Sequence, residues 1–169
     1  IVGIAADFLL AGVHTTSYTL GFALHRIAKD KRVQELLHQE ALKALPSSTD
    51  DLKPQIINSE IPYTRAVLKE TFRLNPIAIG VGRILNHDTV LGGYLVPKNV
   101  RDCFSLMLLS HEIFFSLFFQ TTVVTQNFVA CRLEENFSEP LRFLPERWLK
   151  TSPQQKLNIN PYLVIPFGH

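Results

Sequence analysis

Lys69-Glu70-Thr71-Phe72-Arg73 is the stretch that decides the fold, together with Pro145-Glu146-Arg147-Trp148 later in the chain. Glu70 and Arg73 are three residues apart, so on a helix they share one face. Their neighbours are apolar, and charges drawn toward a core must be paired, because breaking a buried pair costs about 3–5 kcal/mol. Arg147 is the candidate second partner of Glu70. Taken alone, the spacing favours the alternative, a surface ion pair that adds little stability.

The composition is that of one ordered globular domain: 169 residues, 46% hydrophobic and 19% charged. A net charge of +2 does not favour nucleic acid as a partner. Cys103 and Cys131 cannot form a disulfide framework, and no paired CxxC spacing suggests zinc. Because the chain begins inside an apolar run and stops at His169, we expect it to be a piece of a larger protein, truncated at both ends.

The apolar periodicity predicts a helix over residues 1–28 that is apolar nearly all round and therefore buried on several sides. A second helix is expected over 31–45, capped by Asp30, and a third is expected to be capped by Ser59 and to end at Asn75. Short strands follow at 83–85, 89–91 and 94–96, and proline-punctuated coil follows residue 135. The pattern predicts a mainly helical fold with a small β component (α+β).

Four motifs in this order resemble those of the cytochrome P450 family. Residues 11–17 resemble the oxygen-binding segment of its central helix, 70–73 its ExxR motif, 143–148 its PER segment and 166–168 the opening of its haem loop. The resemblance covers nearly the whole chain except residues 100–120. It implies one partial P450 domain, 1–169, from the central helix to the start of the haem loop, and haem b as cofactor of the complete parent.

The resemblance implies a catalytic role for three residues of the first helix. Thr15 matches the threonine beside bound dioxygen, and Gly12 leaves room for the oxygen. His14 stands where the family usually has Asp or Glu, and an imidazole can also relay protons near neutral pH. The alternatives are a core histidine without a catalytic role and an ordinary helix threonine that bonds back to a carbonyl. A hydrolase built from His14 with Thr15 or Ser17 is disfavoured, because no oxyanion device is visible.

For the cofactor, the resemblance implies that Arg83 pairs with a haem propionate and that Phe167 and Gly168 open the haem loop. A surface strand arginine is the alternative for Arg83. The axial cysteine of the family is expected beyond His169, so no metal ligand is expected within this chain. Glu70, Arg73 and Arg147 would form the structural network that fixes the meander behind the loop.

Two basic residues, Arg65 and Lys69, match positions that mitochondrial members of the family use to dock a ferredoxin of the adrenodoxin type. The alternative is a solvated helix face. The resemblance to this class implies a membrane-associated parent on the matrix side of the mitochondrial inner membrane and a lipophilic, steroid-like substrate. The chain most resembles arthropod enzymes that hydroxylate ecdysteroid precursors, with the 22-hydroxylase favoured.

The implied activity of the complete parent is that of a haem-thiolate monooxygenase that takes electrons from a ferredoxin for steroid hydroxylation. The alternative is a catalytically inactive fragment or interaction module that lacks the haem-ligand cysteine. Residues 100–120 are interpreted as a retained intron: Val100-Arg101 can be written as a splice donor, and Phe114–Gln120 as a pyrimidine tract ending in CAG. A membrane contact and a natural insertion are the alternatives, although His111 and Glu112 make the segment too polar to span readily.

Overall fold

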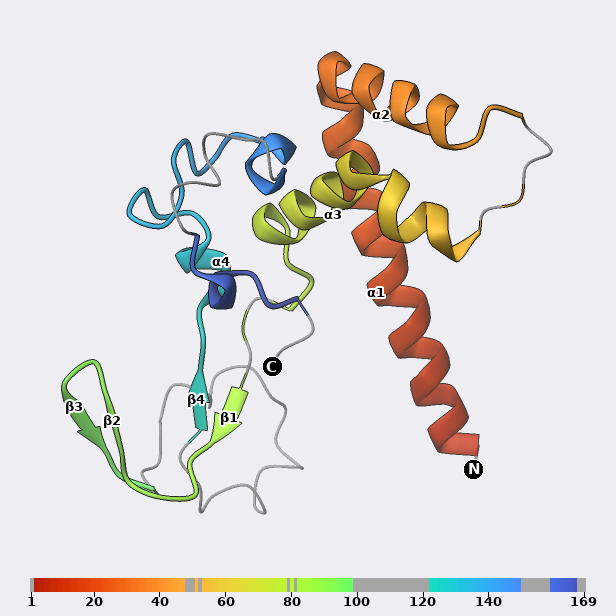
Figure 1. Cartoon of the computed structure of the whole chain (residues 1–169). Helices are drawn as coiled ribbons and strands as arrows, with labels where there is room; N and C mark the ends of the chain where they lie inside the picture. Colours follow the sequence, from red (N-terminus) through yellow and green to blue (C-terminus); the bar gives the residue numbers. More distant parts are fainter. Residues whose placement is uncertain are drawn as a thin grey trace. The chain divides into compact units, whose positions relative to one another are not determined.

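The computed structural model describes residues 2–47, 51, 53–78, 80, 82–98, 122–149 and 159–166 (Figure 1). They belong to two compact units, one formed by Ile1–Ile79 with Asn127–His169 and the other by Gly80–Gln126. Helices and proline-rich coil form the first unit, and short strands form the described part of the second. The expected mainly helical fold with a small β component is confirmed.

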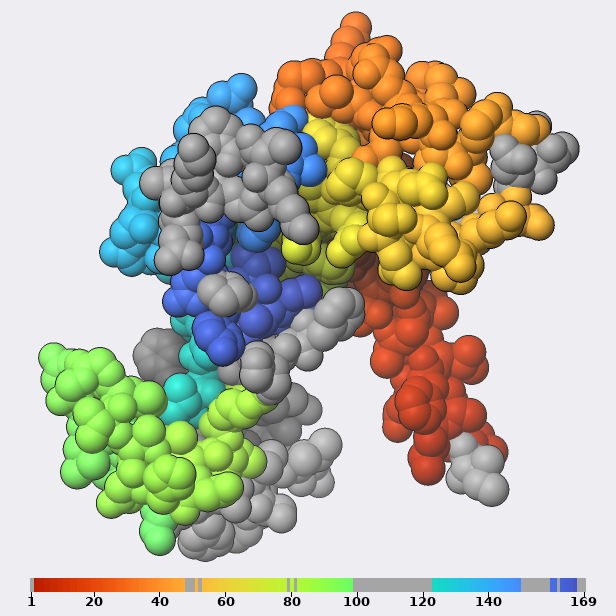
Figure 2. Space-filling view, in the orientation of Figure 1, coloured from red at the N-terminus to blue at the C-terminus, as the bar shows by residue number. Residues whose placement is uncertain are grey.

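The first helix, α1, runs without a break over Val2–Lys29. Its C-terminal half packs against α2 (Lys31–Ala44) and α3 (Pro62–Leu74), whereas its N-terminal half extends beyond them (Figure 1, Figure 2). Large apolar side chains on the extending half are exposed, Phe8 by 75% and Leu9 by 69%. The expectation that this helix is buried on several sides is therefore wrong within the described residues, because neighbours cover only one end of it.

Asp30 caps α2, as the sequence predicts. The Asp30 carboxylate accepts the backbone N–H groups of Arg32 at 3.0 Å and Val33 at 3.3 Å, which satisfies two of the free amides at the helix start. The helix ends at Ala44, where the backbone N–H of Leu45 donates to the carbonyl of Ala41 at 2.8 Å. Asp30 therefore sets the chain direction between α1 and α2.

The cap of α3 is supplied from another helix. Pro62 occupies the first turn and Asn75 ends the helix, as expected, but Ser59 is not its cap. The Ser59 hydroxyl instead donates to the carbonyl of Gln55 at 2.8 Å, within the short π-helix η1 (Ile56–Glu60). The cap expected at Ser59 is wrong because η1 continues to Glu60 and so carries that hydroxyl away from the start of α3.

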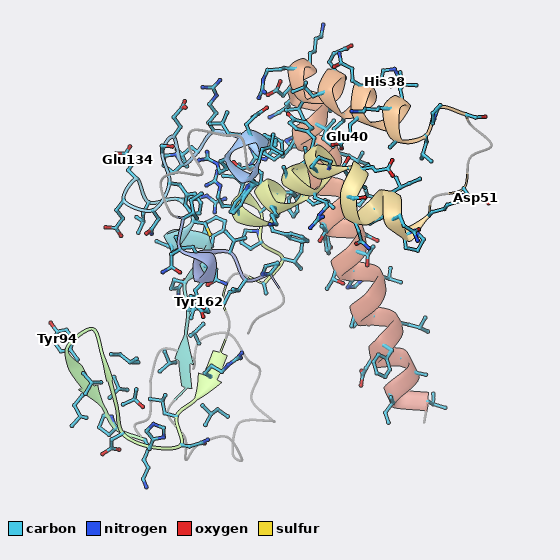
Figure 3. The ribbon with its side chains drawn as sticks, in the orientation of Figure 1. His38, Glu40, Asp51, Tyr94, Glu134 and Tyr162 are labelled. Carbon is cyan, nitrogen blue, oxygen red and sulfur yellow. The ribbon has the colours of Figure 1, made fainter. Side chains whose placement is uncertain are left out.

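Glu40 of α2 takes over this role. Its Oε1 accepts the N–H of Tyr63 at 2.6 Å, and its Oε2 accepts both the N–H and the hydroxyl of Thr64, at 2.8 and 2.7 Å. Figure 3 labels Glu40 between α2 and α3. A carboxylate at a helix N-terminus satisfies free amides and complements the helix dipole, so α2 and α3 are joined by a tertiary cap.

The core of the first unit lies between α2, α3 and the coil on either side of η3 (Pro145–Trp148). Its buried members are Val33, Tyr63 and Val67. Partly buried apolar side chains pack around them: Ile27, Leu36, Leu37, Phe143 and Leu149. The apolar face of α3 thus meets residues more than seventy positions later, which brings the two halves of the opening motif together.

The coil after α4 (Asn127–Ala130) consists of successive turns that lead into η3, and η5 (Pro161–Leu163) follows later. Glu139 in this coil has a φ of 46°, a conformation that residues other than glycine rarely adopt. Backbone groups in such coil lack the regular partners of a helix or sheet, and buried ones need partners from side chains. The arginines described below provide them.

In the second unit, β1 (Gly82–Ile84) pairs antiparallel with β4 (Thr122–Val124), with Arg83 opposite Val123. The strands β2 (Thr89–Leu91) and β3 (Tyr94–Val96) form an antiparallel hairpin. Its turn residues, Gly92 and Gly93, have φ values of 58° and 84°, as a two-residue hairpin turn requires. The expected strands are confirmed, whereas residues 100–120 lie outside the described residues. In the parts of the chain that the structure describes, no helix is long and apolar enough to cross a membrane.

Candidate functional site

Glu70 is the centre of a charged network and has no solvent-exposed surface. Arg73 approaches its carboxylate with two nitrogens, Nε at 2.9 Å from Oε2 and Nη2 at 2.8 Å from Oε1. Arg147 adds its Nε at 3.1 Å from Oε1. Both guanidinium groups are buried as well, so the structure brings together the three charges that the sequence singles out.

Two further donors complete the coordination of Glu70, and both come from the segment around η3. The backbone N–H of Leu144 donates to Oε1 at 3.0 Å, and the indole Nε1–H of Trp148 donates to Oε2 at 2.9 Å. A buried carboxylate is costly unless it is hydrogen-bonded throughout. With five donors on two oxygens, the charge of Glu70 is compensated and η3 is fixed against α3.

The rest of the Arg73 guanidinium binds the coil. Nη1 donates to the carbonyls of Cys131 at 2.6 Å and Pro140 at 2.7 Å, and Nη2 donates to the carbonyl of Arg142 at 3.2 Å. Together with its two bonds to Glu70, this employs all five N–H groups of an arginine. The coil from Cys131 to Arg142 is therefore closed around one buried cation.

Arg147 closes the same coil from the other side. Its Nη1 donates to the carbonyl of Ser138 at 3.1 Å, and its Nη2 lies 3.4 Å from the carbonyl of Glu139, the residue with positive φ. The ring of Phe137 lies under both cations, 4.9 Å from the guanidinium carbon of Arg73 and 5.8 Å from that of Arg147. Among the described residues, no buried side-chain nitrogen or oxygen lacks a hydrogen-bond partner, so every polar group of the network is hydrogen-bonded.

A second, outer cluster was not found by sequence reasoning. Glu146, the neighbour of Arg147, pairs with Arg32 of α2 through both carboxylate oxygens and accepts the hydroxyl of Tyr63 at 2.9 Å. Burial raises the pKa of Glu146, but the hydrogen bonds from Arg32, its own backbone and Tyr63 outweigh burial and leave that pKa below its usual value. Burial and the bond to Glu146 raise the pKa of Tyr63. The PER motif is thus anchored inward by Arg147 and outward by Glu146.

The C-terminal end of α3 is held by two more arginines. Arg132 donates to the carbonyl of Leu74 and its guanidinium carbon lies 3.6 Å from the ring centroid of Phe128. Arg26 of α1 donates through Nε to the side chain of Asn75 at 3.0 Å. Cations near the last carbonyls of a helix complement its dipole. These contacts fix the point at which the chain leaves α3.

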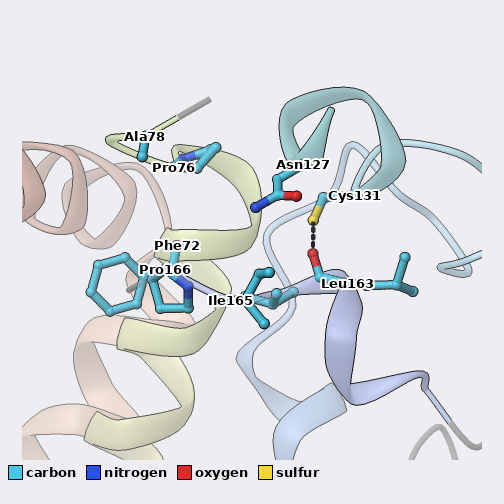
Figure 4. Close-up of a pocket in the computed structure, with 9 residues that line it drawn as sticks. Phe72, Pro76, Ala78, Asn127, Cys131, Leu163, Ile165 and Pro166 are labelled. Atoms are coloured by element: carbon cyan, nitrogen blue, oxygen red, sulfur yellow. Dashed lines mark hydrogen bonds between the residues drawn. The ribbon is translucent and has the colours of Figure 1, made fainter. Parts of the chain in front are cut away.

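A small hollow lies beside this exit (Figure 4). Its volume is about 10 Å³, which is room for roughly one water molecule. The thiol of Cys131 donates to the carbonyl of Leu163 at 3.1 Å at its edge. Burial raises the pKa of the Cys131 thiol more than the nearby Arg73 and Arg132 lower it. Within the described residues, Cys131 therefore acts as a buried structural hydrogen-bond donor.

The three residues expected at an oxygen-binding site lie on the exposed part of α1. The Thr15 hydroxyl donates to the carbonyl of Ala11 at 2.7 Å, and the helix stays continuous around it. The ring of His14 lies 6.1 Å from that of Tyr18 in a tilted arrangement. A side chain at Gly12 would meet no atom of the described residues within 4 Å. The structure does not bring these three residues into the Glu70 network.

Of the three residues expected to contact haem, the structure describes Arg83. Arg83 lies on β1 in the second unit, where its Nη1 donates to the carbonyl of Gly82 at 3.0 Å. Phe167, Gly168 and Cys103 lie outside the described residues. Within the described ranges, no group of three or more histidine, cysteine and acidic side chains is placed to hold a metal ion.

The two basic residues proposed for partner docking are both exposed on α3. Arg65 donates through Nη1 to the carbonyl of Asn58 at 2.7 Å. The ammonium of Lys69 lies 5.8 Å from the centre of the Trp148 ring. Each cation is thus held at a defined place on the surface of this helix.

A family model described as Cytochrome P450 matches residues 1–116 of this chain. The chain is 52% identical, over all of its 169 residues, to Cytochrome P450 302a1, mitochondrial, from Drosophila melanogaster. The chain belongs to the cytochrome P450 family. It is also 33% identical to the human Sterol 26-hydroxylase, mitochondrial, and 32% identical to the human 25-hydroxyvitamin D-1 alpha hydroxylase, mitochondrial, each over 99% of this chain. It spans 29% of the length of the Drosophila relative and 28% of each human one.

Cytochromes P450 use haem held by a cysteine thiolate. Among the described residues the free cysteine is Cys131, and its buried thiol donates to the carbonyl of Leu163. The described residues form a hydrogen-bonded charge network around the coil from Cys131 to Arg142. The described part of this P450 chain therefore contains the charge network that the sequence predicts.

Proposed function

We propose that this chain is part of a haem-thiolate monooxygenase that hydroxylates a steroid-like substrate with electrons from a ferredoxin. The observation that carries the proposal is the buried Glu70–Arg73–Arg147 network in a chain 52% identical to a mitochondrial P450. Because the chain covers 29% of that relative, the activity, substrate and partners belong to the whole protein. When bound, the haem would supply the oxygen chemistry.

In this proposal, the network gives the coil a fixed shape. Arg73 and Arg147 bind carbonyl groups from Cys131 to Arg142, and Glu70 is the counter-charge that both cations share. The thiol of Cys131 extends the same contacts to Leu163, just before the Phe167-Gly168 segment. A framework without free buried charges can hold a following loop without rearrangement. Arg83 would pair with a haem propionate, and Phe167 and Gly168 would open the loop.

The proposed proton path uses α1. Thr15 would hold a proton donor beside the oxygen site and Gly12 would leave space there, which agrees with the open surroundings of Gly12 in the described residues. His14 would deliver protons in place of the acidic residue usual in the family, since an imidazole ring carries both a proton donor and an acceptor nitrogen. Exchanging Thr15 for alanine should lower product formation relative to electron consumption, without changing substrate affinity.

The mitochondrial class and its partner are supported by the names of three relatives and by the basic face of α3. We propose that the whole protein lies on the matrix side of the mitochondrial inner membrane. An adrenodoxin-like ferredoxin would bind at Arg65 and Lys69. Two relatives are named for hydroxylating a sterol and a vitamin D compound, which supports a steroid-like substrate. Within that class we propose an ecdysteroid precursor, hydroxylated at carbon 22.

We further propose that the chain is one domain over residues 1–169, interrupted by a retained intron at 100–120. In support, β4 begins at Thr122, two positions after the last residue of that segment, and pairs with β1. Transcript reads that join the codons of Asn99 and Thr121 are expected to predominate. Abundant reads that carry the 63 nucleotides between them would contradict this proposal.

An inactive fragment or interaction module is the second candidate, favoured by the hydrogen bond that occupies the Cys131 thiol at the Leu163 carbonyl. Haem titration of the 169-residue chain separates it from an active unit. The chain alone should give no thiolate-type absorption with carbon monoxide after reduction. Appearance of that absorption would show that the chain holds its own thiolate ligand.

The decisive experiment uses the full-length gene product. Purified protein should show the thiolate-type carbon monoxide absorption and should hydroxylate an ecdysteroid precursor when supplied with an adrenodoxin-like ferredoxin and its reductase. A microsomal flavoprotein reductase is the matched control and should support little turnover. Turnover with the flavoprotein but not with the ferredoxin would refute the class, and turnover of non-steroid substrates alone would refute the substrate.

A further inference from the structure

Trp148 touches both the buried network and the exposed face of α3, with two different parts of its indole. Its Nε1–H donates to Glu70 at 2.9 Å, and its ring face lies 5.8 Å from the ammonium of Lys69. Glu70 and Lys69 are neighbours in sequence, yet one is fully buried and the other is exposed. One side chain therefore joins the inside of α3 to its surface.

The two contacts are geometrically linked. The indole has a single hydrogen-bond donor, so the bond to the immobile carboxylate of Glu70 restricts the orientation of the ring. Phe137 adds a second restriction, with its ring centre 6.3 Å from that of Trp148 at an angle of 56°. A ring held in this way presents a fixed negative face, on which a nearby ammonium is attracted to one place.

The place of Lys69 matters for binding because a lysine side chain has many rotamers. Ordering such a chain at an interface reduces affinity, and restricting it beforehand recovers part of that loss. Lys69 stays exposed while it lies over the ring, so its charge remains available to a partner. Arg65, one turn earlier, is held by the Asn58 carbonyl instead and offers an internal comparison.

We propose that Trp148 is a positioning residue for an acidic protein partner, because it orients the Lys69 ammonium on the surface of α3 from a ring fixed by Glu70. This inference rests on the proposed docking of a ferredoxin at Arg65 and Lys69. Trp148 belongs both to the docking surface and to the buried charge network. A substitution of Glu70 would therefore change the affinity for the partner through Trp148.

A double-mutant cycle in the full-length haem protein tests it. The dissociation constant for an adrenodoxin-like ferredoxin is measured at low ionic strength for Lys69→Met, with Trp148 present and in the Trp148→Leu background. A cation–π contact at an exposed site corresponds to about 2- to 5-fold in an equilibrium constant. Lys69→Met should therefore weaken binding about 2- to 5-fold more when Trp148 is present.

Arg65→Met is the matched control and should weaken binding equally with and without Trp148. The reduced carbon monoxide absorption reports the haem site independently of binding. If Trp148→Leu lowers that absorption, the cycle is repeated with Trp148→Phe in its place. Phenylalanine keeps an aromatic ring at this position but lacks the Nε1 donor. Coupling to Lys69 should then be reduced but not abolished.

The outcomes distinguish the positioning role of Trp148 from the docking of a ferredoxin at Arg65 and Lys69. If Lys69→Met and Arg65→Met both weaken binding but neither is coupled to Trp148, the positioning role is refuted while the docking surface stands. If Trp148→Leu is coupled equally to both cations, its role is general to the fold and the inference is also refuted. If neither cation affects ferredoxin affinity, the docking surface itself is wrong.

Discussion

Tyr63 donates its hydroxyl to Glu146 across 2.9 Å and so joins the start of α3 to η3. The ring of Tyr63 lies in the core with Val33 and Val67, and its backbone N–H is bound by Glu40. Arg32 pairs with Glu146 on the same side. The PER segment is thus held by an inner network centred on Glu70 and by an outer one centred on Glu146.

The outer network should respond to acid. The pKa of Glu146 in the folded protein lies below its usual value, so its stabilisation is fully present above the ordinary glutamate pKa of about 4.3 and is lost as pH falls through the lowered value. Glu146→Gln should be less stable than the parent at neutral pH by about 1–2 kcal/mol, the scale of a lost hydrogen bond to a charged group, discounted for partial exposure.

Thermal melts of the full-length protein at neutral and acidic pH check this. The difference between Glu146→Gln and the parent should narrow as the pH drops below about 4. A difference that stays constant with pH would show that Glu146 is not ionised against Arg32. Tyr63→Phe is the companion variant, since it removes one hydrogen bond and leaves the carboxylate in place.

The inner network should be far more sensitive to loss of its central charge. Glu70→Gln leaves Arg73 and Arg147 buried without a counter-charge, which costs about 3–5 kcal/mol. Glu139→Gln is a matched control, because Glu139 and Arg142 form an ion pair of the same i,i+3 spacing with side chains 52% and 62% exposed. That control should change stability by less than about 0.5 kcal/mol.

Melting temperature and the amplitude of the thiolate-type carbon monoxide absorption are the measurements for this pair. Both should fall in Glu70→Gln and stay unchanged in Glu139→Gln. Equal behaviour of the two variants would mean that burial does not decide the strength of the Glu70–Arg73 pair. A loss of stability without a change in the haem absorption would instead separate the network from the haem loop.

Sequence reasoning found the inner network because its signal is local and chemical. Charges set among apolar residues need partners, and Arg147 was the available cation in the later motif. The helices and hairpin strands were predictable for a related reason, since periodicity, Asp30 before a helix and two glycines between strands act within a few residues. The family resemblance, carried by motifs such as Glu70–Arg73, supplied the overall order.

What sequence reasoning missed depends on neighbours far away in the chain. Ser59 was the local candidate to cap α3. The free amides of Tyr63 and Thr64 are instead bound by Glu40, 23 and 24 residues before them, through the packing of two helices. The ion pair between Arg32 and Glu146 could not be predicted from local sequence, because the two residues are 114 positions apart. The apolar pattern of residues 1–28 predicted the helix α1 itself. It could not show that the described residues cover only one end of that helix.

The tertiary cap can be tested at single amides. Glu40→Ala should expose the N–H groups of Tyr63 and Thr64 and cost about 1 kcal/mol, the usual price of a lost helix cap. Hydrogen exchange at these two amides should accelerate while exchange at the middle of α3 changes less. Glu35→Ala, on an exposed face of the same helix, is the control and should leave both amides protected. Unchanged protection in Glu40→Ala would assign the cap to another group.

The exposed half of α1 predicts the behaviour of the 169-residue chain by itself. Phe8, Leu9 and Leu10 are each more than 60% exposed on one stretch of helix, and contiguous apolar surface of this kind promotes association. The isolated chain should therefore be poorly soluble and elute as large species on size exclusion. Exchanging Phe8 and Leu9 for lysine should increase the monomer fraction without weakening the Glu70 network, which lies on another helix. A sharp, cooperative melt of monomeric parent chain would contradict the prediction, because it would show that the described contacts alone suffice for a stable fold.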